Sequence, residues 1–174
     1  HISDEPYEYF TYAPARHVSP GSFRDAATHT ISIYSLSKAY GFAGWRVGYV
    51  IAPKEFMPAL TAMHGNFFIS TNEFVQWAAL AALREAADES ARFRRIFDER
   101  RRVMVDGLRG IGLGVGALPT GAFYVLANAR RFTSDSLAFA FEILDRAHVG
   151  VTPGVDFGRN AEGYLRFSYA QSLE

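Results

Sequence analysis

The sequence predicts an α/β fold, because segments with strand-like alternation are separated by segments with helical spacing. Residues 30–36 alternate Ile31 and Ile33 with polar neighbours, and residues 46–52 form a second apolar strand closed by Pro53. Residues 88–109 instead repeat apolar side chains at helical spacing. Both periodicities therefore occur in one chain, as mixed architectures require.

The first part of the chain contains two strands and the start of a helical region. Residues 1–4 read as the end of a further strand. Ser70 and Glu73 have the spacing of a capping box, which predicts a helix over 74–87. The next helix, 88–109, should stop at Gly110. We expect its charged side chains to form a solvated face, a phosphate-binding patch being the weaker interpretation: Arg92, Arg94, Arg95, Glu99, Arg100, Arg101 and Arg102.

The second part begins with a glycine-rich loop over 110–121. It is followed by a predicted strand at 122–127, an amphipathic helix at 134–148 and a short strand at 149–152. The last strand, 164–170, alternates its side chains between two faces. Leu165, Phe167 and Tyr169 share one face, and Tyr164, Arg166 and Ser168 share the other.

Composition narrows the classes of function. The 174 residues fit one domain or pieces of two, and the formal net charge is +0, so there is no basic footprint for nucleic acid or an anionic membrane. No apolar run approaches the roughly 20 residues of a membrane span. The absence of cysteine excludes disulfides and thiolate sites and suits a cytoplasmic protein. The histidines show no metal-ligand spacing, so we expect no metal site.

At both ends of the sequence a predicted element is incomplete. Residues 1–4 are the end of a strand without its beginning, and residues 172–174 resemble a helix start with nothing after it. We therefore expect a fragment; a complete small protein with frayed ends is the alternative.

Most of the candidate site residues lie in one segment, residues 35–49. A lone lysine after a strand is usually a surface residue, but Lys38 follows hydroxyl side chains at the end of a predicted strand. Arg46 enters the next strand, where a guanidinium can grip a phosphate. A reactive amine and an anion site would then meet at the carboxyl ends of strands, where open α/β sheets bind ligands. The supporting residues are Ser35, Ser37, Gly41, Gly44 and Gly48.

This segment resembles the Schiff-base motif of the class I/II aminotransferases, which have pyridoxal 5'-phosphate (PLP) fold type I. The resemblance implies that Lys38 forms a Schiff base with the cofactor, PLP. It further implies that Ser35 and Arg46 hold the cofactor phosphate, with Ser37 in a supporting role.

Three further segments resemble the same family in the expected order. Residues 3–7 resemble its Asp-Glu-x-Tyr segment, so Asp4 would pair with the pyridine nitrogen and Tyr7 with the ring hydroxyl. Residues 120–124 resemble its Gly-x-Phe-Tyr strand near the substrate. Residues 153–158 and 164–168 resemble the loop and strand that present an arginine to the substrate α-carboxylate, which assigns that role to Arg166.

The resemblance implies an enzyme that transfers an amino group between an L-amino acid and a 2-oxo acid, with Lys38 moving the α-proton. Residues 1–95 would be the end of a large, mainly parallel-sheet domain, and residues 96–174 a truncated small α/β domain. The family also implies a homodimer. Residues 64–73 contain no arginine to read a second substrate carboxylate, which leaves dicarboxylate selectivity open.

Three alternatives remain at this stage. Another PLP reaction, such as that of a β-lyase or a cyclase, would use the same lysine, arginine and aspartate. A transcription regulator with an aminotransferase-like effector domain would resemble the family over the same motifs. An inactive truncated product would carry them without the first half of the site.

Overall fold

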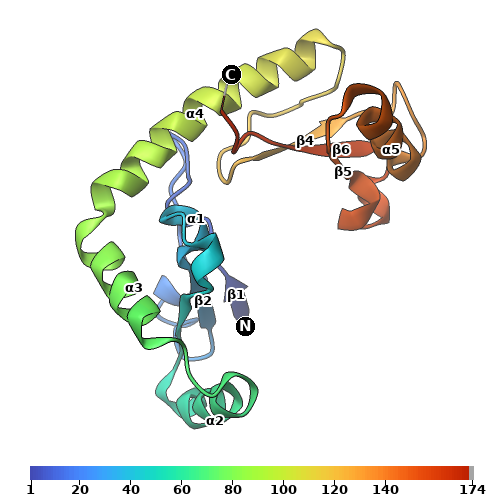
Figure 1. Cartoon of the computed structure of the whole chain (residues 1–174). Helices are drawn as coiled ribbons and strands as arrows, with labels where there is room; N and C mark the ends of the chain where they lie inside the picture. Colours follow the sequence, from blue (N-terminus) through green and yellow to red (C-terminus); the bar gives the residue numbers. More distant parts are fainter. Residues whose placement is uncertain (173–174) are drawn as a thin grey trace. The chain divides into compact units, whose positions relative to one another are not determined.

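The computed structural model describes residues 1–172, and the chain divides into two compact units, His1–Arg94 and Arg95–Glu174 (Figure 1). Each unit contains its own three-stranded sheet. Within the described residues, no helix combines the length and the apolar character that crossing a membrane requires.

The sheet of the first unit has the order β1-β2-β3. Its strands are β1 (Ile2–Asp4), β2 (Ile31–Ser35) and β3 (Gly48–Ile51). β1 runs parallel to β2, whereas β3 is antiparallel to β2. The three expected strands are thus confirmed, with shorter bounds, and the sheet is mixed. The carboxyl ends of β1 and β2 and the beginning of β3 share one edge.

The core of this unit holds the segment after β2 in place. α1 (Leu36–Ala39) begins at Ser35, and its Leu36 and Ala39 are buried. Leu36 packs in a cluster with Ala79 and Ala82 of the helix α3 (Glu73–Glu85). Because Leu36 and Ala39 are the buried residues of α1, the polar residues Ser37 and Lys38 remain less buried, next to the end of β2.

Two helical expectations need correction. The N-cap of α3 is Asn72, whose side chain accepts a hydrogen bond from the Phe74 amide at 3.2 Å. Ser70 lies outside the helix, so the predicted capping box does not form. The helix α2 (Met57–Phe68) was not expected. Its apolar residues are not gathered on one side of the helix, so the sequence shows no apolar stripe at helical spacing there, and none of its residues is buried.

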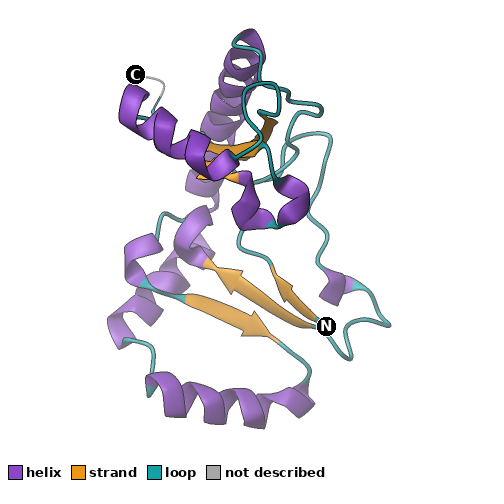
Figure 2. Ribbon diagram, turned by 90° about the vertical axis from the view of Figure 1, so that its right-hand side faces the viewer, coloured by secondary structure: helices purple, strands orange, loops and turns teal. Residues whose placement is uncertain are grey.

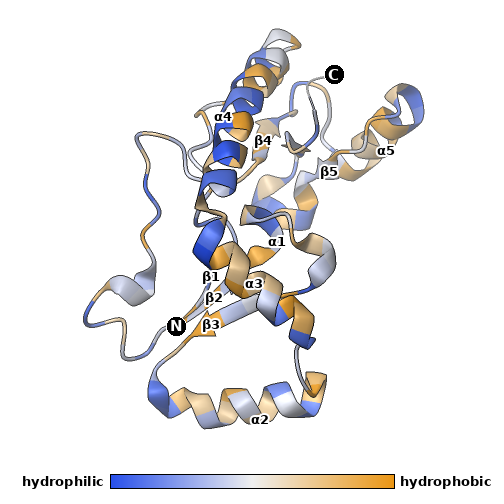
Figure 3. Cartoon of the chain, turned by 60° about the vertical axis from the view of Figure 1, so that its left-hand side comes forward, coloured by the Kyte–Doolittle hydropathy of each residue, from blue (hydrophilic) through white to orange (hydrophobic). Residues whose placement is uncertain are grey.

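Helix α4 (Ala87–Gly110) matches its predicted range closely, and hydrophobic and hydrophilic bands alternate along it (Figure 3). The expectation that all its arginines are solvated is wrong for Arg101, which is only 2% exposed. Arg101 pairs with Asp98 and donates to the Pro119 carbonyl. A guanidinium can be buried here because a carboxylate and a carbonyl receive its N–H groups.

The second unit has an antiparallel sheet of order β4-β6-β5. Its strands are β4 (Tyr124–Asn128), β5 (Thr152–Pro153) and β6 (Tyr164–Ser168). β4 and β6 lie at their expected places, whereas β5 overlaps the strand predicted at 149–152 only at Thr152. Helix α5 (Ser136–Ala147) contacts β5 and β6 and is capped by the Asp135 side chain. Val125, Ala127 and Leu165 form the buried face of the sheet.

Short 3-10 turns complete the chain and position its loops. In the first unit these are η1 (Pro20–Ser22), η2 (Ala43–Trp45) and η3 (Lys54–Phe56). In the second they are η4 (Gly154–Phe157) and η5 (Arg159–Ala161). A Cβ at Gly154 would lie 1.9 Å from the Ala161 carbonyl oxygen, so only glycine fits where the two turns meet.

Candidate functional site

The three strands of the first sheet lie side by side (Figure 2). Sequence-predicted residues lie at or near one edge of this sheet. Asp4 is the last residue of β1 and pairs in register with Ile33, two residues before the end of β2. Ser35 ends β2 and pairs with Gly48 at the start of β3. Because Arg46 lies two residues before Gly48, it belongs to the same edge. Tyr7 follows β1 in the adjoining turn.

Lys38 lies on the one-turn helix α1, directly beyond the end of β2. The Ser35 hydroxyl oxygen accepts the Ser37 amide at 3.2 Å and so caps this turn. Leu36 and Ala39 are buried on one side, while Lys38 is only partly buried. The lysine therefore lies on a turn whose backbone is fixed by the buried Leu36 and Ala39 and by the Ser35 cap.

Arg46 adopts a left-handed backbone conformation, with φ 53° and ψ 52°. A non-glycine residue there is destabilised by roughly 1–2 kcal/mol, and such strain clusters at functional positions. The side chain is exposed and donates one hydrogen bond, from Nη1 to the Ala43 carbonyl at 2.8 Å. This bond anchors the guanidinium and leaves its other N–H groups for an anion.

The adjacent acids Asp4 and Glu5 lie in opposite environments. Asp4 is exposed, whereas Glu5 is 6% exposed and contacts His17 and Ser19. Successive residues of a strand face opposite sides, and the Glu5 amide continues the ladder by donating to the Ile33 carbonyl at 2.8 Å. The sequence analysis selected Asp4 and missed Glu5. The alternation of side chains along a strand already implied that these two neighbours lie on opposite faces.

Aromatic side chains surround the turn after β1. The rings of Tyr9 and Tyr40 meet edge to face at 5.7 Å, and those of Tyr34 and Tyr49 stack at 4.9 Å. Burial raises the pKa of both Tyr40 and Tyr49; next in importance are Tyr9 for the pKa of Tyr40 and the charge of Glu8 for the pKa of Tyr49. Burial also raises the pKa of Glu8, which accepts a hydrogen bond from the Tyr49 hydroxyl at 3.4 Å.

Arg166 lies in the second unit, in the middle of β6. It is paired in register with Leu126 of β4 and Thr152 of β5. Its guanidinium carbon lies 4.3 Å from the centroid of the Tyr124 ring and 4.9 Å from that of Phe157. Nη2 donates to the Thr152 hydroxyl at 3.2 Å. The side chain is thus partly buried and oriented by aromatic rings, unlike an ordinary solvated strand arginine.

The sequence profile of the family "Aminotransferase class I and II" matches residues 1–173. The chain is 39% identical to an aspartate aminotransferase of Pyrococcus horikoshii, over 99% of this chain and 44% of the relative. It is 38% identical to an aspartate/prephenate aminotransferase of Thermus thermophilus, again over 99% and 44%. The chain therefore spans less than half the length of these relatives.

Solved structures of aminotransferases are also similar to this chain. An aromatic aminotransferase from Pyrococcus horikoshii superposes with a TM-score of 0.93 at 35% identity, covering 98% of this chain and 46% of the other. Thermus thermophilus aspartate aminotransferase with maleate superposes with a TM-score of 0.87 at 37% identity, covering 98% and 44%. These neighbours confirm the expected α/β architecture of PLP fold type I.

Proposed function

Because the chain belongs to the class I and II aminotransferase family, we propose that the full-length protein transfers an amino group between an L-amino acid and a 2-oxo acid. The activity is assigned to the whole protein, since the chain covers 44% of its relatives' length. We place the chain as the C-terminal half. The order of its segments supports this, with the Lys38 motif early and the Arg166 strand late.

We assign the two units to the two domains of such an enzyme. The unit His1–Arg94 is proposed as the end of the large cofactor-binding domain, and the unit Arg95–Glu174 as part of the small domain. The division falls within helix α4, which fits a boundary near residues 95 and 96.

The chemistry of the sheet edge fits PLP as the cofactor. The exposed carboxylate of Asp4, the amine of Lys38 and the exposed guanidinium of Arg46 lie at this edge. They have the chemistry that the pyridine nitrogen, the aldehyde and the phosphate of PLP need. When bound, the cofactor supplies an electron sink for the negative charge that develops at the substrate α-carbon.

Lys38 has two roles in this proposal. Its amine would hold the cofactor covalently in the absence of substrate. Once the substrate amine has displaced it, the free Lys38 amine would take the proton from the substrate α-carbon and later return it. Proton transfer needs an amine at a defined place. The buried Leu36 and Ala39 beside it, and the Ser35 cap of the same turn, supply that placement.

The other residues at the edge bind and orient. Asp4 keeps a proton on the pyridine nitrogen, and Tyr7 hydrogen-bonds the ring hydroxyl. Arg46 and Ser35 hold the phosphate, with Ser37 in support. The Ser35 oxygen already accepts the Ser37 amide, so its hydroxyl hydrogen remains to be donated to a phosphate oxygen.

Arg166 is proposed as the ligand of the substrate α-carboxylate. Tyr124 and Phe157 lie against the guanidinium, and Thr152 takes one donor. The remaining donors form the planar fork that binds carboxylates with two parallel hydrogen bonds. An arginine already oriented loses less conformational entropy on binding than a mobile one.

We also propose a cytoplasmic homodimer. Helix α2 and the segment after it expose large apolar side chains, including Phe67, Phe68 and Ile69, which are 72%, 71% and 86% exposed. Trp77 on α3 adds a further exposed ring, 65% accessible. An apolar surface of this kind is typical of an interface between protein chains.

The position of Lys38 at the same sheet edge as Arg46 and Asp4 carries the proposal. The test is borohydride reduction of the full-length protein after incubation with PLP, followed by peptide mass mapping. A mass increase of one reduced cofactor on Lys38 supports the proposal. A full-length protein that gains no adduct, or gains it only at other lysines, contradicts it.

A further inference from the structure

Glu5 is a buried carboxylate that none of the assigned roles uses. Its Oε2 lies 2.7 Å from Nε2 of His17, and its Oε1 accepts a hydrogen bond from the Ser19 hydroxyl at 2.8 Å. Both partners come from the loop between β1 and β2, more than ten residues further along the chain. Burial by itself raises the pKa of Glu5, but hydrogen bonds, that of Ser19 foremost, outweigh burial and lower the pKa.

Glu5 is therefore ionised and can only accept hydrogen bonds. This requires His17 to carry a hydrogen on Nε2 and to donate it. The Ser19 hydrogen is likewise directed to Glu5, so the Ser19 oxygen is left to accept from others. The three side chains form a directional chain of charge-assisted hydrogen bonds, which are stronger than neutral ones.

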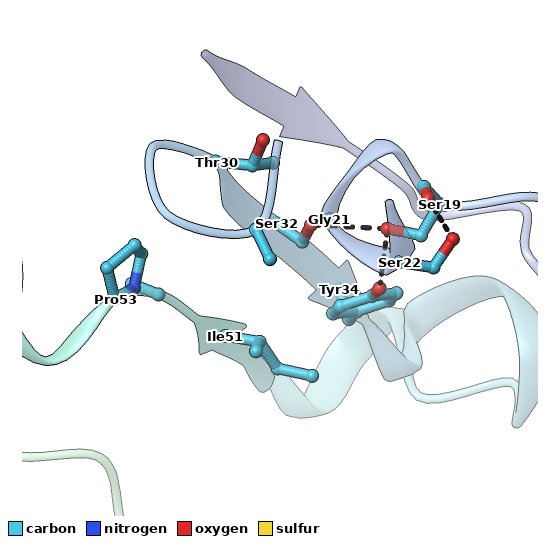
Figure 4. Close-up of a pocket in the computed structure, with 10 residues that line it drawn as sticks. Ser19, Gly21, Ser22, Thr30, Ser32, Tyr34, Ile51 and Pro53 are labelled. Carbon is cyan, nitrogen blue, oxygen red and sulfur yellow. Dashed lines mark hydrogen bonds between the residues drawn. The ribbon is translucent and has the colours of Figure 1, made fainter. Parts of the chain in front are cut away.

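The chain of hydrogen bonds continues into β2. The Tyr34 hydroxyl donates to the Ser19 oxygen at 3.3 Å, and the Ser32 hydroxyl lies 3.3 Å from the same oxygen (Figure 4). Tyr34 stacks on Tyr49 of β3. Ser19 thus joins the end of β1, through Glu5, to two residues of β2.

A cavity lies beside these hydroxyl groups, so they are not closely packed on every side. They border a cavity of about 330 Å³, whose lining includes Ser19, Ser32 and Tyr34 together with Ile51 and Pro53. Side chains beside such a space can move unless directional bonds hold them. The hydrogen bonds to Glu5 provide that restraint.

Glu5 and Tyr34 are each adjacent in sequence to a residue of the proposed cofactor site. Glu5 directly follows Asp4, and neighbouring strand residues face opposite sides, so anchoring Glu5 inward orients Asp4 outward. Tyr34 directly precedes Ser35, which caps the turn that carries Lys38. The network is therefore one residue away from a proposed cofactor ligand on each of two strands.

We propose that Glu5 is a positioning residue which, through His17 and Ser19, fixes Asp4 relative to the turn that carries Lys38. This inference rests on the proposed PLP site. It assigns to Glu5 no contact with cofactor or substrate. Its effect would be to set the separation and orientation of two groups, Asp4 and Lys38, that are proposed to hold the cofactor.

The test uses the full-length protein with Glu5→Gln, which keeps the size of the side chain but turns an amide NH₂ toward donors. We measure the PLP dissociation constant, the visible circular dichroism band of the bound cofactor, kcat and the thermal midpoint. We expect PLP to bind about tenfold to a hundredfold more weakly, with an altered dichroism band and a similar fall in kcat. The circular dichroism band reports cofactor orientation directly, independently of turnover.

Matched variants make the test decisive. Glu89→Gln removes an exposed carboxylate that pairs with Arg92 and should change none of these quantities. His17→Ala should reproduce the effect of Glu5→Gln, and it keeps the test valid where Glu5→Gln does not fold. His17→Gln can still donate to Glu5 and should restore most of the affinity for PLP.

Two outcomes would overturn the inference. If Glu5→Gln and His17→Ala lower only the thermal midpoint, while PLP affinity and the dichroism band stay unchanged, the network is structural and does not position the site. If the unmodified full-length protein does not bind PLP at all, the proposed function itself fails and this role falls with it. The unmodified protein therefore tells the two failures apart.

Discussion

Arg166 of β6 and Tyr124 of β4 are diagonal neighbours on adjacent antiparallel strands, with the guanidinium carbon 4.3 Å from the ring centroid. The ring lies against the guanidinium and Thr152 takes one of its N–H donors, so the other donors are available to a ligand. Replacing Arg166 with leucine should raise KM for the amino acid roughly tenfold to a hundredfold, with a smaller change in kcat. Steady-state kinetics of the full-length protein would measure this.

The control for that experiment is Arg146→Leu on α5. Arg146 is an exposed arginine that pairs with Glu142 on the same helix. Its removal should leave both kinetic constants unchanged. An unchanged KM in Arg166→Leu would show that the α-carboxylate is bound elsewhere.

Lys38→Ala should lower the rate of transamination by about a hundredfold to ten-thousandfold, because the variant lacks the group proposed to move the α-proton. Lys54→Ala is the matched control, since it removes the other lysine of these 174 residues, from the exposed turn η3. Both are compared by turnover and by the borohydride adduct. Substantial turnover in Lys38→Ala would remove the lysine from the mechanism.

Asp4→Asn should slow proton abstraction roughly a hundredfold to a thousandfold while PLP stays bound, because a neutral amide does not hold a proton on the pyridine nitrogen. Single-turnover rates with α-deuterated and ordinary amino acid would show whether the affected step is proton removal. Asp25→Asn, at an exposed loop position, should behave as the unmodified protein. A kcat unaltered by Asp4→Asn argues against the assignment.

Asp98 links pH to the stability of the second unit. Burial by itself raises the pKa of Asp98, but the hydrogen bond from Arg102 and the charge of Arg101 outweigh it and lower the pKa. The ionised form therefore stabilises the fold above the ordinary aspartate pKa of about 4, and this stability is lost as the pH falls through the lowered pKa.

Accordingly, Asp98→Asn should cost about 1–3 kcal/mol at pH 7, at the lower end because Asp98 is partly exposed, and less at about pH 2–3. Urea unfolding at both pH values would measure the free energy of unfolding. Asp106→Asn, exposed on the same helix, is the control. A destabilisation that is the same at both pH values would mean that the charge of Asp98 is not its cause.

The cap of α3 gives a small and direct test. Asn72→Ala should destabilise the protein by about 1 kcal/mol, because the Phe74 amide loses its acceptor. Ser70→Ala should have almost no effect, since Ser70 lies outside the helix. Thermal unfolding distinguishes the two, and a larger loss for Ser70→Ala would favour the capping box instead.

Much of the fold could be predicted because its signals are local. The strand at residues 31–35 and the helix at residues 87–110 follow from periodicity over neighbouring residues. Helix α2 was missed because its apolar residues are not gathered on one side, so the sequence shows no apolar stripe there. The cap of α3 was misplaced because Ser70 and Asn72 both carry acceptor side chains close together, and only the backbone geometry chooses between them.

By itself, the sequence determined the residue types of the proposed site and their order, since Lys38, Arg46 and Asp4 belong to short contiguous motifs. The tertiary structure decided which distant side chains meet: Glu5 with His17, and Arg101 with the Pro119 carbonyl. Such contacts depend on how loops close, and periodicity carries no information about that. Burial was decided in the same way, because a carboxylate or a guanidinium enters the interior only where the fold supplies its partners.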